Sequence, residues 1–368
     1  MFVGFAILDR LLATPSRAQR FRRTWLATAF WLFPAMLWMW DLTPPGYLIA
    51  GGLYSCYFGL AAALTPHDAT GRRLVLPGAV VLAEAARWYW PFGGVPLANI
   101  ALSQVETPLA ALARLGGPLL IIAVVVALGQ ALSAMLDNNR RAVRVTVGIV
   151  LVALAAAFLH PRASVVREID AALVQGGGPT RTRASSDQEP IVLARHIEAT
   201  RSISRPVDLI LWPENVVNPG RFLDSEVAAA AIRKVAADQN ATVLAGWFYS
   251  VSDTATVNYQ AAVTPDGVEV DRYDKVRIVP FGEYVPLRSF IEATGLADAI
   301  PARDAIPGTA EPVLDTPVGP VGVAISWEAF FERRSRDASA NGAQILTNPT
   351  NGSSFWLTQV HTQQVASN

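Results

Sequence analysis

The chain has 368 residues, of which 52% are hydrophobic and only 16% are charged, and its formal net charge is zero. Soluble domains carry about a quarter charged residues, so this composition indicates that much of the chain is solvated by lipid. The charge balance argues against a nucleic-acid-binding protein, and one cysteine with four histidines offers no metal-ligand spacing, so we expect no nucleic-acid partner and no metal or other cofactor.

Apolar stretches in the first 160 residues predict membrane-spanning helices. Each approaches the 17 to 25 residues that such a helix needs, the last being the shortest. They cover residues 24–40, 46–65, 74–90, 117–136 and 145–160. The segment Met1–Ala13 is too short and carries two charges, so it is either an interfacial helix or the remnant of a longer N-terminal span. Residues 1–162 are therefore predicted to form a transmembrane domain of about five to six helices.

Arginine placement predicts how these helices are oriented. Arginines precede the first stretch and follow the second and the fourth, whereas the alternate loops contain almost none, as the positions of Arg22, Arg23, Arg72, Arg73, Arg140 and Arg141 illustrate. Short arginine-rich loops stay in the cytoplasm. The segment after His160 is therefore predicted to lie on the extracytoplasmic side.

From about Ala163 the pattern changes to alternating strand and helix signals. Strands are predicted at 169–175, 207–214, 241–250, 257–264 and 321–326, and helices at 225–238 and after Glu328. The turn-forming sequence Thr264–Gly267 predicts a hairpin over Tyr259–Lys275. Residues 163–368 are therefore predicted to form an α/β domain.

Glu214 closes a strand that is apolar enough to be buried on both faces. A carboxylate at the end of such a strand has little water around it, and desolvation would raise its pKa toward that of a working general base. The alternative is a surface carboxylate that caps a neighbouring helix.

Lys275 follows the hairpin and precedes an apolar segment, where an ammonium needs a carboxylate or backbone partner. Beside a reacting carbonyl it could stabilise an oxyanion. Glu283 lies eight residues further on, in a loop restricted by Pro280 and Pro286. A snorkelling lysine and a purely structural Glu–Lys pair are the alternatives.

Ser326 ends a strand and is followed by Trp327, Glu328 and a helical segment. A strand-to-helix turn exposes a nucleophile above a sheet, close to backbone N–H groups. A serine there needs a base to take its proton. The alternative is a helix N-cap serine with no chemistry.

Glu84 and Arg87 lie one turn apart at the end of the third apolar stretch. Charge inside a membrane is costly, so this pair lines a polar entrance or neutralises itself, and the two readings are compatible.

These positions, in this order behind a polytopic membrane half, resemble the apolipoprotein N-acyltransferase family of the nitrilase (carbon-nitrogen hydrolase) superfamily. The most specific segment is KVRIVPFGEYVP at Lys275–Pro286, and the similarity extends through LVQGGGP at Leu173–Pro179 to TNPTNGSSFW at Thr347–Trp356. The resemblance implies an α-helical membrane domain joined to an αββα sandwich. It implies that Glu214 is the general base, that Lys275 stabilises the oxyanion, that Glu283 supports the site and that Ser326, Trp327 and Glu328 form the nucleophile element.

The resemblance also implies the partners. The family takes an acyl chain from a membrane phospholipid onto a cysteine and passes it to the amino group of a diacylglyceryl-cysteine lipoprotein, in the bacterial plasma membrane. A monomer is expected.

Two features depart from the family. Ser326 stands where the family has cysteine, which leaves open an engineered inactive variant, a serine enzyme, or a lipid- or lipoprotein-binding protein that has lost catalysis. The family also continues beyond the position of Asn368, so the α/β domain is expected to be incomplete. A membrane-anchored amidase would also explain the carboxylates and the lysine.

Overall fold

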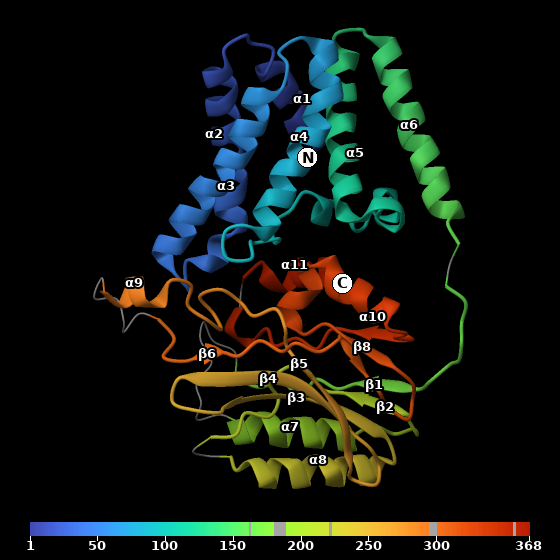
Figure 1. Cartoon of the computed structure of the whole chain (residues 1–368). Helices are drawn as coiled ribbons and strands as arrows, with labels where there is room; N and C mark the ends of the chain where they lie inside the picture. The colour runs from blue at the N-terminus through green and yellow to red at the C-terminus, as the bar shows by residue number, and fades with distance from the viewer. Residues whose placement is uncertain (162, 180–188, 221–222, 294–299, 356–357) are drawn as a thin grey trace. The chain divides into compact units, whose positions relative to one another are not determined.

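The structure is a computed structural model that describes every residue except 162, 180–188, 221–222, 294–299 and 356–357. The chain forms two compact units (Figure 1). The first comprises Met1–Ala163 with Val365–Ser367, and the second comprises Ser164–Gln364 with Asn368.

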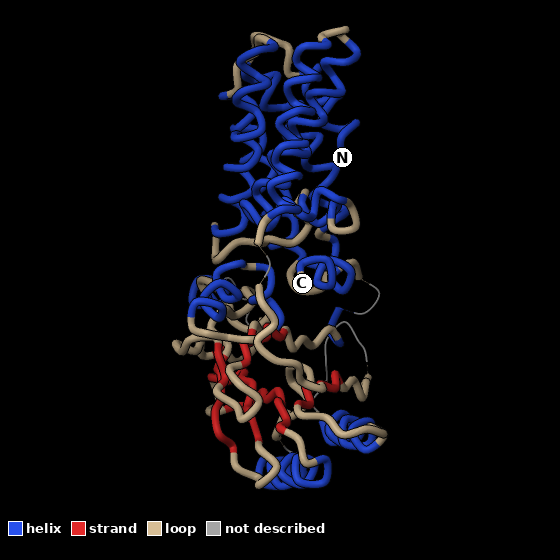
Figure 2. Tube along the Cα trace, turned by 90° about the vertical axis from the view of Figure 1, so that its right-hand side faces the viewer, coloured by secondary structure: helices blue, strands red, loops and turns tan. Residues whose placement is uncertain are grey.

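The first unit is helical, and its long helices run alongside one another (Figures 1 and 2). They are α1 (Phe2–Leu11), α2 (Arg17–Ala35), α3 (Pro44–Leu64), α4 (Ala69–Tyr89), α5 (Ala113–Leu136) and α6 (Arg140–Leu159), with short 3₁₀ turns η1 (Leu37–Met39), η2 (Ala101–Gln104) and η3 (Pro108–Leu112). Within the described chain, three helical segments are long and apolar enough to cross a membrane, namely Pro44–Leu64, Pro108–Leu136 and Arg140–Leu159. Membrane crossing by α2 and α4 stays a prediction.

The helices α2 and α4 begin five or more residues before the apolar stretches that predicted them. The Ser16 hydroxyl accepts a hydrogen bond from the Gln19 N–H at 3.3 Å, and the Asp68 carboxylate accepts one from the Gly71 N–H at 2.7 Å. Such N-caps satisfy amide groups that the helix leaves unpaired. Arginines lie near the start of both helices, so an apolar stretch marks the beginning of each helix several residues too far along the chain.

The helix α1 packs against other helices of the first unit. The Asp9 carboxylate on α1 is 1% exposed and lies 2.8 Å from Arg72 Nε on α4. The same carboxylate accepts hydrogen bonds from Gln130 at 3.1 Å and Ser133 at 2.8 Å, both on α5. A buried carboxylate needs this degree of compensation, so the network fixes α1 against two other helices.

The second unit contains two sheets. The larger has strand order β1-β2-β3-β4-β5 with β6 paired to β4, and the smaller has order β7-β8-β9. Their bounds are β1 (Ala171–Leu173), β2 (Leu209–Leu211), β3 (Thr242–Ser250), β4 (Ala255–Val263), β5 (Glu269–Asp274), β6 (Asp304–Ala305), β7 (Val313–Leu314), β8 (Val321–Val323) and β9 (Ile345–Thr347). The predicted hairpin is confirmed, because Tyr259 pairs with Asp274 in antiparallel register.

Helices cover the outer faces of this unit (Figure 1). They are α7 (Glu189–Arg201) and α8 (Ser225–Gln239) on the larger sheet and α10 (Glu332–Ala340) on the smaller, with α9 (Arg288–Ala293), η6 (Ser326–Phe330), η7 (Ser353–Phe355) and α11 (Val360–Ser367) in the connections. The helix α7 and the strands β6, β7 and β9 were not among the predicted elements.

Strand periodicity explains the layers. Ile210 and Val243 point toward α7 and α8, in a core shared with Ile232. Leu209 and Leu244, one residue away on the same strands, pack between the sheets. Successive side chains on a strand face opposite sides, so strands that are apolar throughout fill two cores at once. The predicted αββα sandwich is therefore confirmed.

Candidate active site

Two charged side chains meet at the ends of β2 and β5, two strands of the larger sheet that are separated by β3 and β4. Glu214 follows β2 and is 7% exposed, and Lys275 follows β5 and is 1% exposed. The Lys275 backbone N–H donates to the Asn258 carbonyl on β4 at 2.8 Å, which continues the β4–β5 ladder by one residue. The hairpin therefore delivers the lysine to the site.

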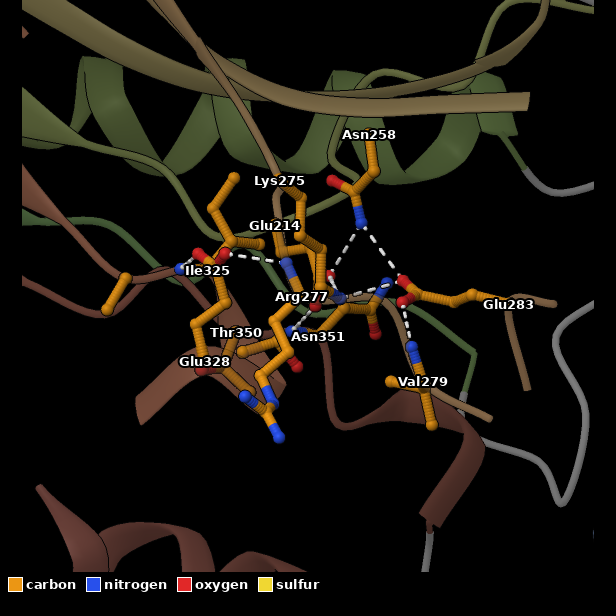
Figure 3. A network of polar contacts seen from close by, with 12 residues as sticks. Glu214, Asn258, Lys275, Arg277, Val279, Glu283, Ile325, Glu328, Thr350 and Asn351 are labelled. Carbon is orange, nitrogen blue, oxygen red and sulfur yellow. Dashed lines mark hydrogen bonds and ion pairs between the residues drawn. The ribbon is translucent and has the colours of Figure 1, made fainter. Parts of the chain in front are cut away.

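Lys275 Nζ lies between two carboxylates, 2.9 Å from Glu214 Oε1 and 2.7 Å from Glu283 Oε1 (Figure 3). The second oxygen of Glu283 accepts a hydrogen bond from the Val279 N–H at 2.7 Å, which ties the loop back on itself. The three charged residues singled out in the sequence thus form one contiguous cluster. Both the surface-cap alternative for Glu214 and the snorkelling alternative for Lys275 are wrong.

Asn258 is a member of this cluster that the sequence reasoning missed. Its Nδ2 donates to Glu214 Oε1 at 2.8 Å and to Glu283 Oε1 at 3.2 Å (Figure 3). The amide and the lysine therefore bridge the same two carboxylate oxygens. An asparagine between the apolar residues Val257 and Tyr259 of β4 was the signal available in the sequence.

The pKa of Glu214 departs from the expectation. Burial raises the pKa of this carboxyl. The charge of Lys275 and the hydrogen bonds from Lys275, Asn258 and the Asn351 N–H lower the pKa by more than burial raises it, so it lies below its ordinary value. Correspondingly, the two carboxylates raise the pKa of Lys275 against the opposing effect of its burial. The prediction of a raised Glu214 pKa is wrong, because desolvation was considered without the ammonium 2.9 Å away.

Ser326 lies on the turn between β8 and η6 and is half-buried. Its φ of 50° is in the left-handed region, which costs a non-glycine residue about 1–3 kcal/mol. The residue is the first of η6, and Ile325 holds the N-cap position, so the N-cap alternative for Ser326 is wrong. Strained backbone of this kind at a strand-to-helix turn is the geometry that exposes a nucleophile.

Glu328 stabilises this turn through hydrogen bonds from the backbone. Its carboxylate is fully buried and accepts hydrogen bonds from the N–H groups of Val276, Arg277 and Ile325 at 2.9, 3.0 and 2.8 Å. Burial raises the pKa of Glu328, and these hydrogen bonds only partly offset that effect. Because it joins the segment after Lys275 to the residue before Ser326, Glu328 positions both. Trp327 is 6% exposed and packs edge-to-face on Phe330 at 5.3 Å.

A loop connects Ser326 to Glu214. The Ser326 N–H donates to the Pro349 carbonyl at 2.9 Å, and two residues later the Asn351 N–H donates to Glu214 Oε2, also at 2.9 Å. Both residues are thus held by the same short segment. Direct approach of the Ser326 hydroxyl to Glu214 stays a prediction.

Glu84 and Arg87 belong to the first unit, where both are fully buried. Arg87 Nη2 lies 2.6 Å from Glu84 Oε2, and Arg87 Nη1 donates to the carbonyls of Val95 and Leu97 at 2.6 and 2.7 Å. The two charges therefore neutralise each other, and Arg87 also anchors the loop that follows α4. A role in substrate binding stays a prediction.

Among the residues that the structure describes, no group of three histidine, cysteine, aspartate or glutamate side chains is arranged to hold a metal ion. In the cluster at Lys275 the single ammonium lies between two carboxylates, so it balances one of their two negative charges.

Known proteins share both parts of the chain. Residues 170–367 match the carbon-nitrogen hydrolase family, and residues 1–131 match the apolipoprotein N-acyltransferase N-terminal domain. An apolipoprotein N-acyltransferase of Mycolicibacterium smegmatis is 29% identical over 201 residues, covering 51% of this chain and 33% of that protein. One of Thermosynechococcus vestitus is 26% identical over 370 residues, covering 90% of this chain and 69% of that protein.

The chain therefore spans a third of the relative from Mycolicibacterium smegmatis and about two thirds of the one from Thermosynechococcus vestitus. The match to the hydrolase family takes in more than half of the chain and includes each residue of the Lys275 cluster. On these grounds the chain belongs to the carbon-nitrogen hydrolase family.

Proposed function

We propose that this protein is an apolipoprotein N-acyltransferase of the bacterial plasma membrane, which moves an acyl chain from a phospholipid to the amino group of a diacylglyceryl-cysteine lipoprotein. The single observation that carries the proposal is the buried cluster in which Lys275 bridges Glu214 and Glu283 beside the turn bearing Ser326. Relatives of that name resemble both the helical and the hydrolase part, and lipid substrates give a reason for joining the two.

The hydrogen bonds favour one oxygen of Glu214 as the proton acceptor. Oε1 already accepts from Lys275 and from Asn258, whereas Oε2 accepts only from the Asn351 N–H among the described groups. A carboxylate oxygen has two lone pairs, so Oε2 retains one. It also lies against the loop that holds Ser326. We therefore assign proton transfer to Oε2.

In the first half-reaction the residue 326 side chain attacks the carbonyl carbon of a phospholipid ester and gives its proton to Glu214 Oε2. The bond from that carbon to the glycerol oxygen then breaks, and the departing oxygen takes the proton back. In the second, the lipoprotein amine attacks the acyl carbon and forms the amide, while the residue 326 heteroatom leaves and recovers a proton through Glu214. Each half-reaction returns Glu214 to its ionised form, which its lowered pKa favours.

Lys275 is suited to stabilise the oxyanion formed in each attack. An ammonium has three N–H donors, and two of them are directed at Glu214 and Glu283. The third remains for the developing negative charge, in a site with little water to compete. Glu283 and Asn258 keep the ammonium and the base in register.

The topology, domain boundary and assembly belong to the same proposal. We place residues 1–162 in the membrane and residues 163–368 on the extracytoplasmic side, as a monomer, with the acyl donor supplied by the bilayer. The arginine-rich loops and the three long apolar helices support this placement.

The test compares Ser326→Cys with the parent. A thiol has a pKa of about 8.5, far closer to neutrality than that of a hydroxyl, so the cysteine variant should accumulate acyl-enzyme from labelled phospholipid faster than the parent. Ser326→Cys combined with Glu214→Ala is the control and should lose the label. Failure of the cysteine variant to acquire a hydroxylamine-sensitive acyl group would contradict the proposal.

The serine itself favours a second candidate, a lipid- or lipoprotein-binding protein that retains the pocket without turnover. It predicts that both the serine and cysteine forms bind phospholipid while neither becomes acylated. A serine form that matches the cysteine form in rate would instead identify a serine acyltransferase.

A further inference from the structure

The loop Thr347–Asn351 continues the pairing of two parallel strands beyond their ends. Val323 of β8 pairs with Thr347 of β9. The Ala324 N–H then donates to the Thr347 carbonyl, and the Ser326 N–H donates to the Pro349 carbonyl, each at 2.9 Å. The two chains therefore stay in register through the turn that carries residue 326.

The Asn348 side chain brackets this turn. Its Nδ2 donates to the Ala324 carbonyl and lies 3.4 Å from the Ser326 carbonyl, so one amide spans the residues on either side of Ile325. Its Oδ1 accepts from the Thr350 hydroxyl at 2.9 Å, which fixes the orientation of the amide.

Gln364 completes the arrangement from another segment of the chain. It is 8% exposed, and its Nε2 donates to the Ser326 carbonyl at 3.1 Å and to Asn348 Oδ1 at 3.0 Å. The peptide groups of Ser326 are thus held on both sides, the N–H by Pro349 and the carbonyl by two side-chain amides. A left-handed φ at a residue with a Cβ persists only when its surroundings fix it in this way.

The same loop holds the base. The Asn351 N–H donates to Glu214 Oε2 at 2.9 Å, across 137 residues of sequence. This is the oxygen that the hydrogen bonds leave able to accept a proton. The loop therefore contacts the backbone of residue 326 and the reactive atom of Glu214 within three residues.

We propose that the loop Thr347–Asn351 sets the separation between residue 326 and Glu214 Oε2, and that Asn348 and Gln364 are positioning residues that hold residue 326 in its left-handed conformation. When both amides are present, the side chain at 326 points toward Glu214. When they are removed, the backbone of residue 326 relaxes toward negative φ, and this change of φ turns the side chain away from Glu214. The inference rests on the proposed function only in taking 326 as the nucleophile position.

The test uses a background in which position 326 alone carries a thiol, Cys56→Ser with Ser326→Cys, because Cys56 is the single cysteine of the chain. Alkylation of this thiol by iodoacetamide is followed against pH in the whole protein in detergent. Asn348→Leu removes the amide at similar size and without adding charge. Asn341→Leu is the matched control, since the Asn341 amide also donates to a backbone carbonyl, that of Asp337 at 2.9 Å, outside the site.

In the background, Glu214 should assist removal of the thiol proton, so the rate at neutral pH should exceed that of a free thiol. Asn348→Leu should lower this rate roughly tenfold or more and move the profile toward that of an ordinary thiol, with a pKa of about 8.5. Asn341→Leu should leave the profile unchanged. Glu214→Gln should slow alkylation in the background and in the Asn341→Leu variant. It should add little to the loss in Asn348→Leu, because there the thiol already points away from the base.

Superimposable pH profiles for Asn348→Leu and the background would overturn the inference. So would a double variant whose alkylation rate falls by the product of the factors found for Asn348→Leu and Glu214→Gln alone. Insensitivity of the background to Glu214→Gln would overturn it as well. Should Asn348→Leu fail to fold, Gln364→Leu removes the second amide and is held to the same expectations.

Alkylation requires no lipid, so the outcomes remain separable from those of the proposed function. A background that is alkylated with Glu214 assistance but never acquires an acyl group from phospholipid contradicts acyl transfer and leaves the positioning role intact. Acylation at equal rates in the background and the Asn348→Leu variant contradicts the positioning role alone.

Discussion

The hydroxyl of Tyr273 donates to the fully buried carboxylate of Glu328, 2.9 Å from Oε1 and 3.1 Å from Oε2. Tyr273 lies in β5, an edge strand of the larger sheet, and Glu328 lies in η6, which follows β8 of the smaller sheet. This contact therefore links the two sheets close to residue 326. Burial and the adjacent carboxylate both raise the pKa of the tyrosine, which keeps the hydroxyl protonated and able to donate.

Replacing Tyr273 by Phe should destabilise the second unit by about 1.5–3 kcal/mol, the usual worth of a hydrogen bond to a charged acceptor. Glu328→Gln should cost more, because its NH₂ group would face N–H donors that now point at carboxylate oxygens. Thermal unfolding followed by tryptophan fluorescence checks the ranking. Equal losses for the two variants would contradict it.

The lowered pKa of Glu214 predicts how stability depends on acid. The unfolded chain has the higher pKa, about 4.3, so it binds the proton first as the pH falls. The stabilisation from ionised Glu214 is therefore complete above that value and is lost as the pH drops through the lower, folded-state pKa. The melting temperatures of the parent and Glu214→Gln should differ most near neutrality and converge in acid. Glu311→Gln, at an exposed glutamate, should give a curve parallel to that of the parent.

Removing the Lys275 charge should be more damaging than removing the whole ion pair. Lys275→Met leaves the buried Glu214 and the half-buried Glu283 without a cation between them, and breaking a buried ion pair costs about 3–5 kcal/mol. Adding Glu214→Gln to Lys275→Met should recover part of this loss, because one uncompensated charge is removed. The measurement is resistance to proteolysis together with the melting temperature, and an additive further loss in the double variant would count against the cluster as described.

Reporter fusions test the orientation of the membrane part. A reporter that is active only outside the cytoplasm should be silent when fused after Asn138 and active when fused after Gly220, because the arginine-rich loops are expected to stay in the cytoplasm. The reverse pattern would overturn the predicted topology.

The sequence led to Glu214, Lys275 and Glu283 because each stands at a strand end or in a proline-restricted loop, where local patterns are informative. Asn258 was missed because its role depends on the register of β4 against β5, where the Lys275 N–H meets its carbonyl. The lowered pKa of Glu214 was missed for a similar reason, since its direction is decided by a lysine 61 residues away.

Asn348 and Gln364 could not be identified from local patterns either. The contact of Asn348 with Ser326 follows from the parallel pairing of β8 with β9, and β9 has only three residues with no clear alternation. Gln364 lies on α11, so its contact depends on where that helix packs. The helices of the first unit were easier to locate because long apolar stretches need no tertiary information. The exception was α1, whose place depends on a partner on α4.

That partner has a consequence for biogenesis. Asp9 is synthesised 63 residues before Arg72 and more than 120 residues before Gln130 and Ser133, so nothing on α4 or α5 is available to neutralise it when α1 leaves the ribosome. The helix α1 is therefore made before its partners, and until α4 and α5 arrive its carboxylate must stay in contact with water or headgroups. Early residues of this membrane protein thus depend on late ones for a stable place in the bundle.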